Sequence, residues 1–268
     1  MRFVVVLAIL ALVPNVGVRA QGSKDSARLS PATTALPVPF QTGERLEYNV
    51  HFGPLRVGQG SMEVMGIVPL RGHDTWHTRL RVKGGIPLAR VDDLFESWID
   101  VSTFSSLRFV QDLSEVGKDR ERHYEFYPDR GTFSENGKPE QPATEHPLDD
   151  GSFLYFVRTV PLEVGQTYEF NRYFRPDRNP VTIKVLRREK IRVPAGTFDT
   201  IVLQPVIKTS KLFADGGQAL IWLSDDSLRM MVQMKTKLSF GSLNLYLTSL
   251  RLTAPPAPPP TPTSTANR

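Results

Sequence analysis

The clearest strand pattern in the chain reads Val232-Gln233-Met234-Lys235-Thr236-Lys237-Leu238-Ser239-Phe240. Its apolar side chains fall on alternate positions, and polar side chains stand between them. Successive side chains of a β-strand point to opposite faces, so this alternation predicts a strand with one dry face and one wet face.

The same period of two recurs along the chain. Thr78, Leu80 and Val82 alternate with three basic residues, and residues 120–126, 181–185 and 243–247 repeat the pattern. Turn signals rich in Gly, Pro and Asn separate these runs, at 52–54, 83–85, 127–131, 135–137 and 215–217. Residues 88–101 fit either a helix or a strand, and we expect a strand from residue 94. The sequence predicts an all-β, mainly antiparallel domain: a curled sheet, a half-barrel or a two-sheet barrel-like domain.

One segment has the helical period instead. Phe153, Phe156, Val157 and Val160 fall on one helix face, and Pro161 stands just past its end. Asp149 or Asp150 is placed to act as the N-cap. We therefore expect one α-helix over about 150–160, covering the sheet.

The N-terminus has the features of a secretory signal peptide. Arg2 precedes an apolar run at 3–13, and Val18-Arg19-Ala20 has small residues where signal peptidase cuts. The run is too short to span a bilayer, which needs about 20 residues. We predict a signal peptide over 1–20 and a mature protein that is periplasmic or otherwise exported, with no transmembrane segment left after cleavage.

The rest of the chain divides into three parts. Residues 21–39 are predicted to form a flexible linker, 40–252 a single antiparallel β domain, and 253–268 a disordered proline-rich tail. The formal net charge is +5, and basic and acidic residues are interleaved. This pattern disfavours nucleic acid as a partner and allows a weak attraction to anionic lipid headgroups. The chain has no cysteine, so the core must stabilise the fold without disulfides.

No catalytic or metal-binding signature is evident. His73 and His77 lie on one predicted strand, where four residues separate their Cα atoms by roughly 13 Å. The acidic doublets at 92–93, 149–150 and 225–226 place neighbouring side chains on opposite faces. Ser152 reads as a first-turn helix serine that satisfies backbone N–H groups. We therefore predict no catalytic residues, no metal site and no cofactor.

Several blocks of sequence, taken in order, carry a resemblance to a known family. They are residues 40–48, 54–60, 148–158, 193–200 and 221–226, the last leading into 230–242. Together they resemble the bacterial exported family called domain of unknown function 3108, over roughly 40–252. The resemblance implies a mostly antiparallel β protein of the cell envelope with no established activity. Trp222, inside the fifth block, is expected to be a core residue.

A helix lying across a curled sheet is similar, in architecture only, to half-barrel carriers of lipids. We therefore expect a non-catalytic binder or carrier of a hydrophobic envelope ligand such as lipid. The predicted groove residues are Phe153, Phe156, Val157, Val160, Met234 and Leu238. The alternative, that the same side chains simply pack against each other as a solid core, is favoured over an open groove. A structural scaffold of the envelope without a small ligand, and a glycan or lipid hydrolase, remain as alternative functions.

Overall fold

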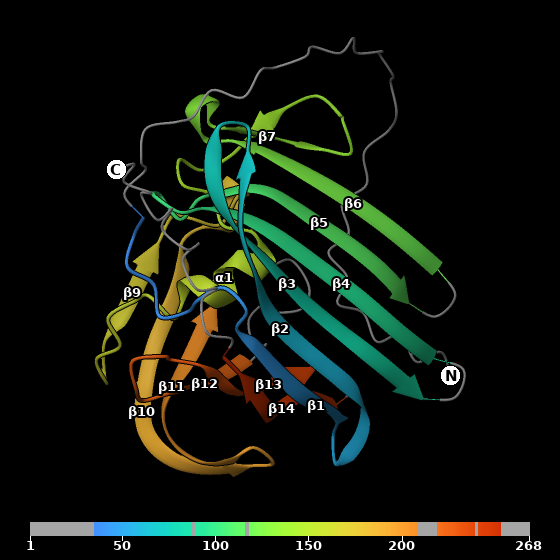
Figure 1. Ribbon diagram of the computed structural model, residues 1–268, viewed down its shortest axis with the longest axis vertical. Coiled ribbons are helices and arrows are strands. Elements are labelled where there is room, and N and C mark those ends of the chain that lie inside the picture. The colour runs from blue at the N-terminus through green and yellow to red at the C-terminus, as the bar shows by residue number, and fades with distance from the viewer. Residues whose placement is uncertain (1–34, 87–88, 116–117, 208–218, 239–240, 253–268) are drawn as a thin grey trace, which may run out of the picture.

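The computed structural model describes residues 35–86, 89–115, 118–207, 219–238 and 241–252 (Figure 1). The predicted signal peptide, most of the predicted linker and the proline-rich tail lie outside the described residues. The predicted turn at 215–217 also lies outside them.

Within these residues, fourteen strands pair into one antiparallel sheet. The N-terminal strands are β1 (Arg45–Phe52), β2 (Leu55–Leu70), β3 (His73–Ile86), β4 (Ala89–Asp100), β5 (Ser106–Glu115), β6 (Lys118–Tyr127), β7 (Thr132–Glu135) and β8 (Gln141–Pro142). The others are β9 (Thr167–Phe170), β10 (Val181–Val193), β11 (Gly196–Val206), β12 (Ala219–Ser224), β13 (Met231–Leu238) and β14 (Gly241–Arg251). Short 3-10 helices occupy Pro128–Arg130 and Pro176–Arg178.

The spatial order is β8-β7-β6-β5-β4-β3-β2-β1-β14-β13-β12-β11-β10-β9, so the sheet is open, with β8 and β9 at its edges. Strands β1 and β14, from opposite ends of the domain, pair at its centre. The sheet curls so that β2 to β6 form one wall and β9 to β12 the other, with the helix α1 (Asp150–Phe156) between them (Figure 1). The predicted all-β antiparallel fold with a curled sheet and a covering helix is confirmed.

Alternation along β1 defines the two faces of the sheet. Leu46, Tyr48 and Val50 are buried in the same core as the helix, whereas Arg45 and Glu47 are half-buried on the other side. We call the side that faces α1 the inner face and the opposite side the outer face.

Helix α1 begins where the sequence predicts and ends earlier. Asp149 is the N-cap, and its side chain accepts hydrogen bonds from the backbone N–H groups of Gly151 and Ser152. The helix ends at Phe156 instead of continuing to about residue 160. The chain tightens there, because the N–H of Arg158 donates to Tyr155 O, three residues back instead of four.

The predicted turn at 83–85 is wrong, because these residues lie within β3. Gly84 pairs directly with Gly58 of β2. A Cβ atom on Gly58 would lie 2.2 Å from Lys83 O, and one on Gly84 would lie 2.4 Å from Val57 O. The glycines therefore allow two strand backbones to approach each other closely, rather than reversing the chain.

Trp222 is buried, at 4% exposure, but it does not belong to the central core. Its neighbours Ile221 and Leu223 point into that core, so Trp222 lies on the outer face. There its Nε1–H donates to Glu189 Oε1 at 2.5 Å, and the Lys235 ammonium lies 5.4 Å from its ring centroid. The expectation of burial is correct, but Trp222 is buried on the outer face and not in the central core.

A buried ion pair joins the end of the helix to the start of the sheet. The Arg158 guanidinium donates to both carboxylate oxygens of Glu44, at 2.6 and 3.0 Å, and the two side chains are 0% and 2% exposed. Arg158 also donates to Pro39 O at 3.1 Å and to Leu228 O at 2.8 Å. Its guanidinium lies 5.4 Å from the centroid of the Phe40 ring. One side chain thus holds three segments that are distant in sequence.

Replacing Arg158 with Met should lower the free energy of unfolding by about 3–5 kcal/mol, because Glu44 is left buried and uncompensated. Arg187→Met is the matched control, since its pair with Glu189 is exposed and should contribute under about 1 kcal/mol. Urea unfolding measures both. Adding Glu44→Gln to Arg158→Met should recover part of the loss. Equal effects of the two Met variants would contradict the anchoring role.

Gly58→Ala should destabilise the fold by about 1–3 kcal/mol, because its Cβ would collide with the backbone of β3. Gly60→Ala, two residues along the same strand, is the control. Its Cβ would first meet Arg81 O at 3.4 Å, a tight but ordinary contact. In thermal unfolding, the melting temperature of the Gly60→Ala variant should be close to that of the parent protein, and that of the Gly58→Ala variant should be well below it. The reverse order would show that the close approach is not required.

Candidate functional site

The predicted groove residues are packed inside the structure. Phe153, Phe156, Val157 and Val160 are all buried, at 7% exposure or less, and belong to the central hydrophobic core. Met234 is partly buried against the same core. Leu238 ends β13, and its side chain lies outside the described part of the structure.

Helix α1 packs chiefly against β3 and β4, whereas Met234 lies on β13 in the other half of the sheet. The Phe156 ring meets Phe170 of β9 edge to face, at 5.0 Å between centroids. A ligand groove between the helix and β13 therefore stays a prediction.

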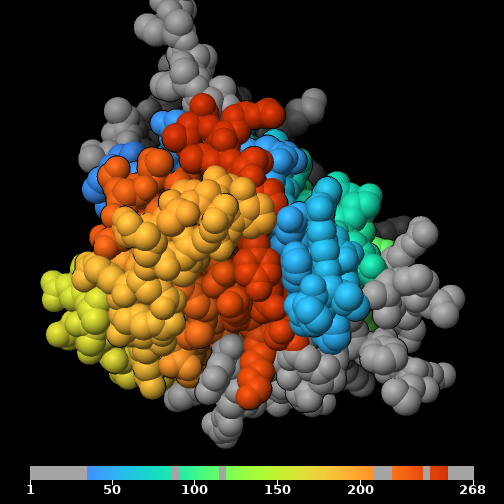
Figure 2. Space-filling model, turned by 90° about the horizontal axis from the view of Figure 1, so that it is seen from below, coloured from blue at the N-terminus to red at the C-terminus, as the bar shows by residue number. Residues whose placement is uncertain are grey.

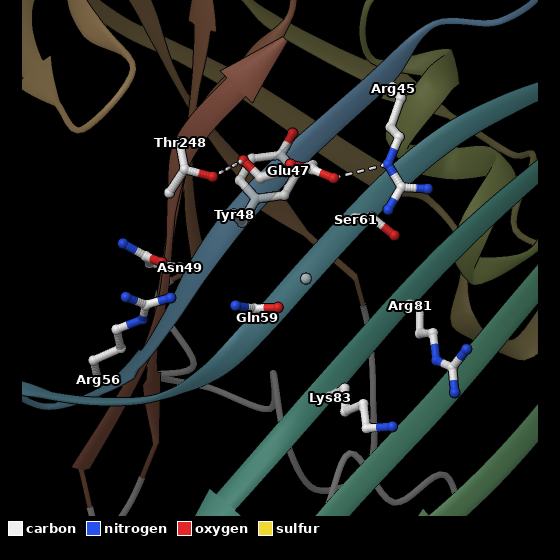
Figure 3. A pocket seen from close by; sticks show the side chains of 11 residues that line it. Arg45, Glu47, Tyr48, Asn49, Arg56, Gln59, Ser61, Arg81, Lys83 and Thr248 are labelled. Carbon is white, nitrogen blue, oxygen red and sulfur yellow. Dashed lines mark hydrogen bonds and ion pairs between the residues drawn. The ribbon is translucent and has the colours of Figure 1, made fainter. Parts of the chain in front are cut away.

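A polar hollow lies on the outer face, over β1, β2, β3 and β14 (Figure 3). Its volume is about 480 Å³. The residues that line it are Arg45, Glu47, Tyr48, Asn49, Arg56, Gln59, Gly60, Ser61, Arg81, Lys83 and Thr248. Four of these side chains are cationic and one is a carboxylate, so an anion is the ligand that the hollow favours.

Strand alternation turns these polar side chains outward. On β3, Leu80 and Val82 pack against the core, so Arg81 and Lys83 between and after them point to the outer face. Gln59 of β2 is exposed and pairs with Lys83. The cations and the amide are therefore side by side on neighbouring strands (Figure 3).

Irregular register on both sides of β1 shapes the hollow. Pairing with β14 shifts between Glu47 and Tyr48, and pairing with β2 shifts between Val50 and His51. Such bulges bend a strand and increase its twist. Thr248 is the extra residue of β14 at the first shift, and its hydroxyl donates to Glu47 O, at 3.0 Å.

The carboxylate in the hollow is already engaged. Arg45 donates to Glu47 at 2.9 Å and also pairs with Glu63 at 2.7 Å. Hydrogen bonds from Ser249 and Arg45 lower the pKa of Glu47, so this carboxyl group stays charged at neutral pH. Its negative charge is balanced locally by Arg45.

The other three cations are less completely neutralised. Arg81 makes two hydrogen bonds to Asp92, at 2.8 and 2.9 Å, and Lys83 shares the same carboxylate at 3.3 Å. Arg56 is exposed and has no ion-pair partner among the described residues. Arg45 is shared by two acids, and Asp92 serves both Arg81 and Lys83. The four cations and three carboxylates therefore leave one excess positive charge at the hollow, on the unpaired Arg56.

Sequence reasoning identified Arg81 and Lys83 only as the wet face of a strand. The residues that complete the hollow, such as Arg45 and Arg56, come from strands 25 or more positions away. The pairing order and the two bulges bring them together, and neither is visible in the alternation of one strand.

A buried polar cluster surrounds the N-terminus of α1. Ser97 Oγ and Ser106 Oγ each donate to an Asp149 carboxylate oxygen at 2.7 Å, and Ser152 Oγ lies 2.9 Å from Ser106 Oγ. All four side chains are at most 1% exposed. Burial raises the pKa of Asp149 to about 6. The cluster is closed to solvent, so it caps the helix and offers no accessible serine to a substrate.

The second acid of this doublet has different partners. The Tyr173 hydroxyl donates to Asp150 Oδ1 at 2.9 Å, and the Gln111 amide donates to Asp150 Oδ2 at 3.4 Å. Burial raises the pKa of Asp150 as well. The two carboxyl groups are thus held by separate groups and do not form one acid–base pair.

The two histidines of β3 pair with acids of β4. His73 Nδ1 lies 2.7 Å from Asp100 Oδ2, and His77 Nε2 lies 3.0 Å from Glu96 Oε1. His77 also stacks on Trp98, at 4.4 Å between ring centroids, and its burial lowers its pKa. In the part of the chain that the structure describes, no three His, Asp or Glu side chains converge in a metal-binding group.

Comparison with known proteins gives the family. The family model described as "protein of unknown function (DUF3108)" matches residues 47–248. The chain belongs to the DUF3108 family. The match covers most of the sheet and the helix, and it assigns the DUF3108 domain no activity. No curated protein matches the chain.

One solved structure shares the fold of this DUF3108 domain, and two others are similar to it to a lower degree. A beta-barrel-like DUF1849 protein from Brucella abortus is 10% identical over 80% of this chain and 99% of that chain, with a TM-score of 0.54. A candidate lipoprotein from Parabacteroides distasonis is 10% identical over 80% of this chain and 98% of that chain, with a TM-score of 0.31. A candidate exported protein with a YmcC-like fold from Bacteroides fragilis is 12% identical over 82% of this chain and 100% of that chain, with a TM-score of 0.31. The first likeness shows the fold alone.

No helix in the described residues is long and apolar enough to cross a bilayer.

The raised pKa of Asp149 gives a test of its burial. A carboxyl group with a pKa of about 6 in the fold and about 3.8 when unfolded stabilises the fold below pH 4. That contribution is lost as the pH rises to about 6, because the fold then holds a proton that the unfolded chain has released. Asp149→Asn keeps a capping oxygen and does not titrate.

Between pH 4 and pH 7, the free energy of unfolding of the parent protein should fall by up to about 3 kcal/mol more than that of the Asp149→Asn variant. Urea unfolding over this range measures the difference. A difference that does not change with pH would show that Asp149 is ionised normally in the fold.

Proposed function

We propose that this DUF3108 protein is an exported, non-catalytic binding protein of the cell envelope, and that it binds the anionic headgroup of a lipid in the outer hollow. The observation that carries the proposal is the hollow itself, which is lined by four cationic side chains and one engaged carboxylate, and in which Arg56 has no ion-pair partner among the described residues. Arginine guanidinium groups suit phosphate, because their paired N–H groups match its oxygens. Residues 1–20, read as a signal peptide, support export.

Gln59 and Ser61 add neutral polar groups between the cations (Figure 3). Such groups fix the orientation of a polyhydroxylated or phosphate-bearing headgroup, whereas the cations supply most of the attraction. The site is open rather than enclosed, which suits the binding of one end of a long ligand. Lipid acyl chains would then remain outside this hollow, because the predicted groove beside α1 lies on the opposite face of the sheet.

Dihexanoyl phosphatidylglycerol, a water-soluble anionic lipid, is the first probe, and isothermal titration calorimetry is the measurement. Dihexanoyl phosphatidylcholine and inorganic phosphate are the comparison titrants. We expect the anionic lipid to bind more tightly than either. Equal binding of phosphatidylcholine would overturn the charge argument, and equal binding of inorganic phosphate would assign the hollow to a free anion instead of a lipid.

Arg56→Gln should weaken binding of dihexanoyl phosphatidylglycerol about ten-fold or more, because it removes the unpaired cation of the hollow. Arg120→Gln is the matched control: Arg120 is exposed on β6, and β4 and β5 separate its strand from β3. It makes the same change in net charge and should alter the affinity less than two-fold. Equal losses in both variants would mean that net charge alone attracts the lipid and that the hollow is not its site.

A further inference from the structure

The hairpin formed by β1 and β2 carries the most exposed large apolar side chain of the described residues. Leu55 is 64% exposed and follows Gly53 and Pro54 at the tip of the hairpin. Figure 2 shows this light-blue hairpin at the surface, beside the red segment of β14. Arg56, the unpaired cation of the hollow, is the next residue. An exposed leucine thus adjoins a cationic anion site.

We propose that this end of the sheet docks on an anionic lipid bilayer, with Leu55 inserted at the boundary of headgroups and acyl chains and Arg56 at the level of the phosphates. The inference rests on the proposed anionic site, and it identifies a lipid bilayer as the surface at which that site binds its headgroups. Apolar side chains beside Lys or Arg are the combination that holds proteins at membrane interfaces. Each basic residue near an anionic surface adds further attraction.

Geometry favours a bilayer over a soluble anion as the partner. Leu55 contributes nothing to the core at this exposure, and a free anion would give it no contact. Gln59, in the hollow, lies four residues along β2 from Leu55, or roughly 13 Å. A side chain buried about 5–10 Å into the interface therefore brings the hollow down to the headgroup layer. Charge and apolar exposure point to the same face.

Flotation with vesicles tests the inference. Vesicles of phosphatidylglycerol mixed with phosphatidylcholine should bind the exported protein, and vesicles of phosphatidylcholine alone should not. Leu55→Ser should lower the partition coefficient about ten-fold, since the leucine no longer enters the bilayer. Ile67→Ser is the matched control, because Ile67 is 49% exposed on the same strand, up to about 40 Å further along. It should bind like the parent protein.

A second measurement reports insertion directly. The chain has no cysteine, so Leu55→Cys and Ile67→Cys each accept one environment-sensitive nitrobenzoxadiazole label. With anionic vesicles, the label at position 55 should shift to shorter wavelength and brighten, and the label at position 67 should not change. Equal responses at the two positions would overturn docking through this tip.

Calorimetry with dihexanoyl phosphatidylglycerol separates the two proposals. Leu55→Ser should bind this soluble lipid like the parent protein, because the hollow is intact. If the soluble lipid binds but Leu55→Ser floats like Ile67→Ser, the anionic site stands and the bilayer docking is wrong. If the parent protein does not bind the soluble lipid, the proposed function itself is wrong.

Discussion

The ion pair between Arg158 and Glu44 is the contact on which the arrangement of helix and sheet depends. Arg158 follows the last turn of α1, and Glu44 immediately precedes β1. A guanidinium group has five N–H donors, and here they also reach Leu228 O, ahead of β13. The same side chain thus fixes the helix end against both halves of the sheet. An apolar residue of equal volume would fill the space but satisfy neither the carboxylate nor the carbonyls.

The seven residues of α1 are too few to form a stable helix by themselves. Polar contacts at both ends hold it: Asp149 caps the N-terminus within a ring of serine hydroxyl groups, and Arg158 fixes the other end. Between them, Phe153 and Phe156 are buried in the core. The polar contacts at its two ends fix the position of the helix, and its apolar side chains stabilise it by packing in the core. This division explains why so polar a cluster lies inside a hydrophobic interior.

Sequence alone predicted the fold class, because alternation of apolar and polar residues is a local property of each strand. It failed where a residue's role depends on a neighbouring strand. Gly84 was expected to turn the chain and instead lies against Gly58 in a ladder, a contact set by register. Trp222 was expected to be a core residue, and it is buried on the outer face instead, whereas Ile221 and Leu223 lie in the central core. The end of α1 was misplaced because Val157 and Val160 continue its apolar spacing although the backbone has already left the helix.

The proposed binding site follows from the same alternation, applied to the outer face. Each inward side chain of β1, such as Tyr48, requires its neighbour to point outward, so a packed interior and a charged exterior are two consequences of one pattern. At the register shift beside Glu47 and Tyr48, Thr248 of β14 is the extra residue, and the hollow lies beside it. Strand β1 therefore closes the sheet against β14 and also shapes the site. Changes to outward side chains should alter binding without reaching the core, whereas changes to the β1 backbone should affect both.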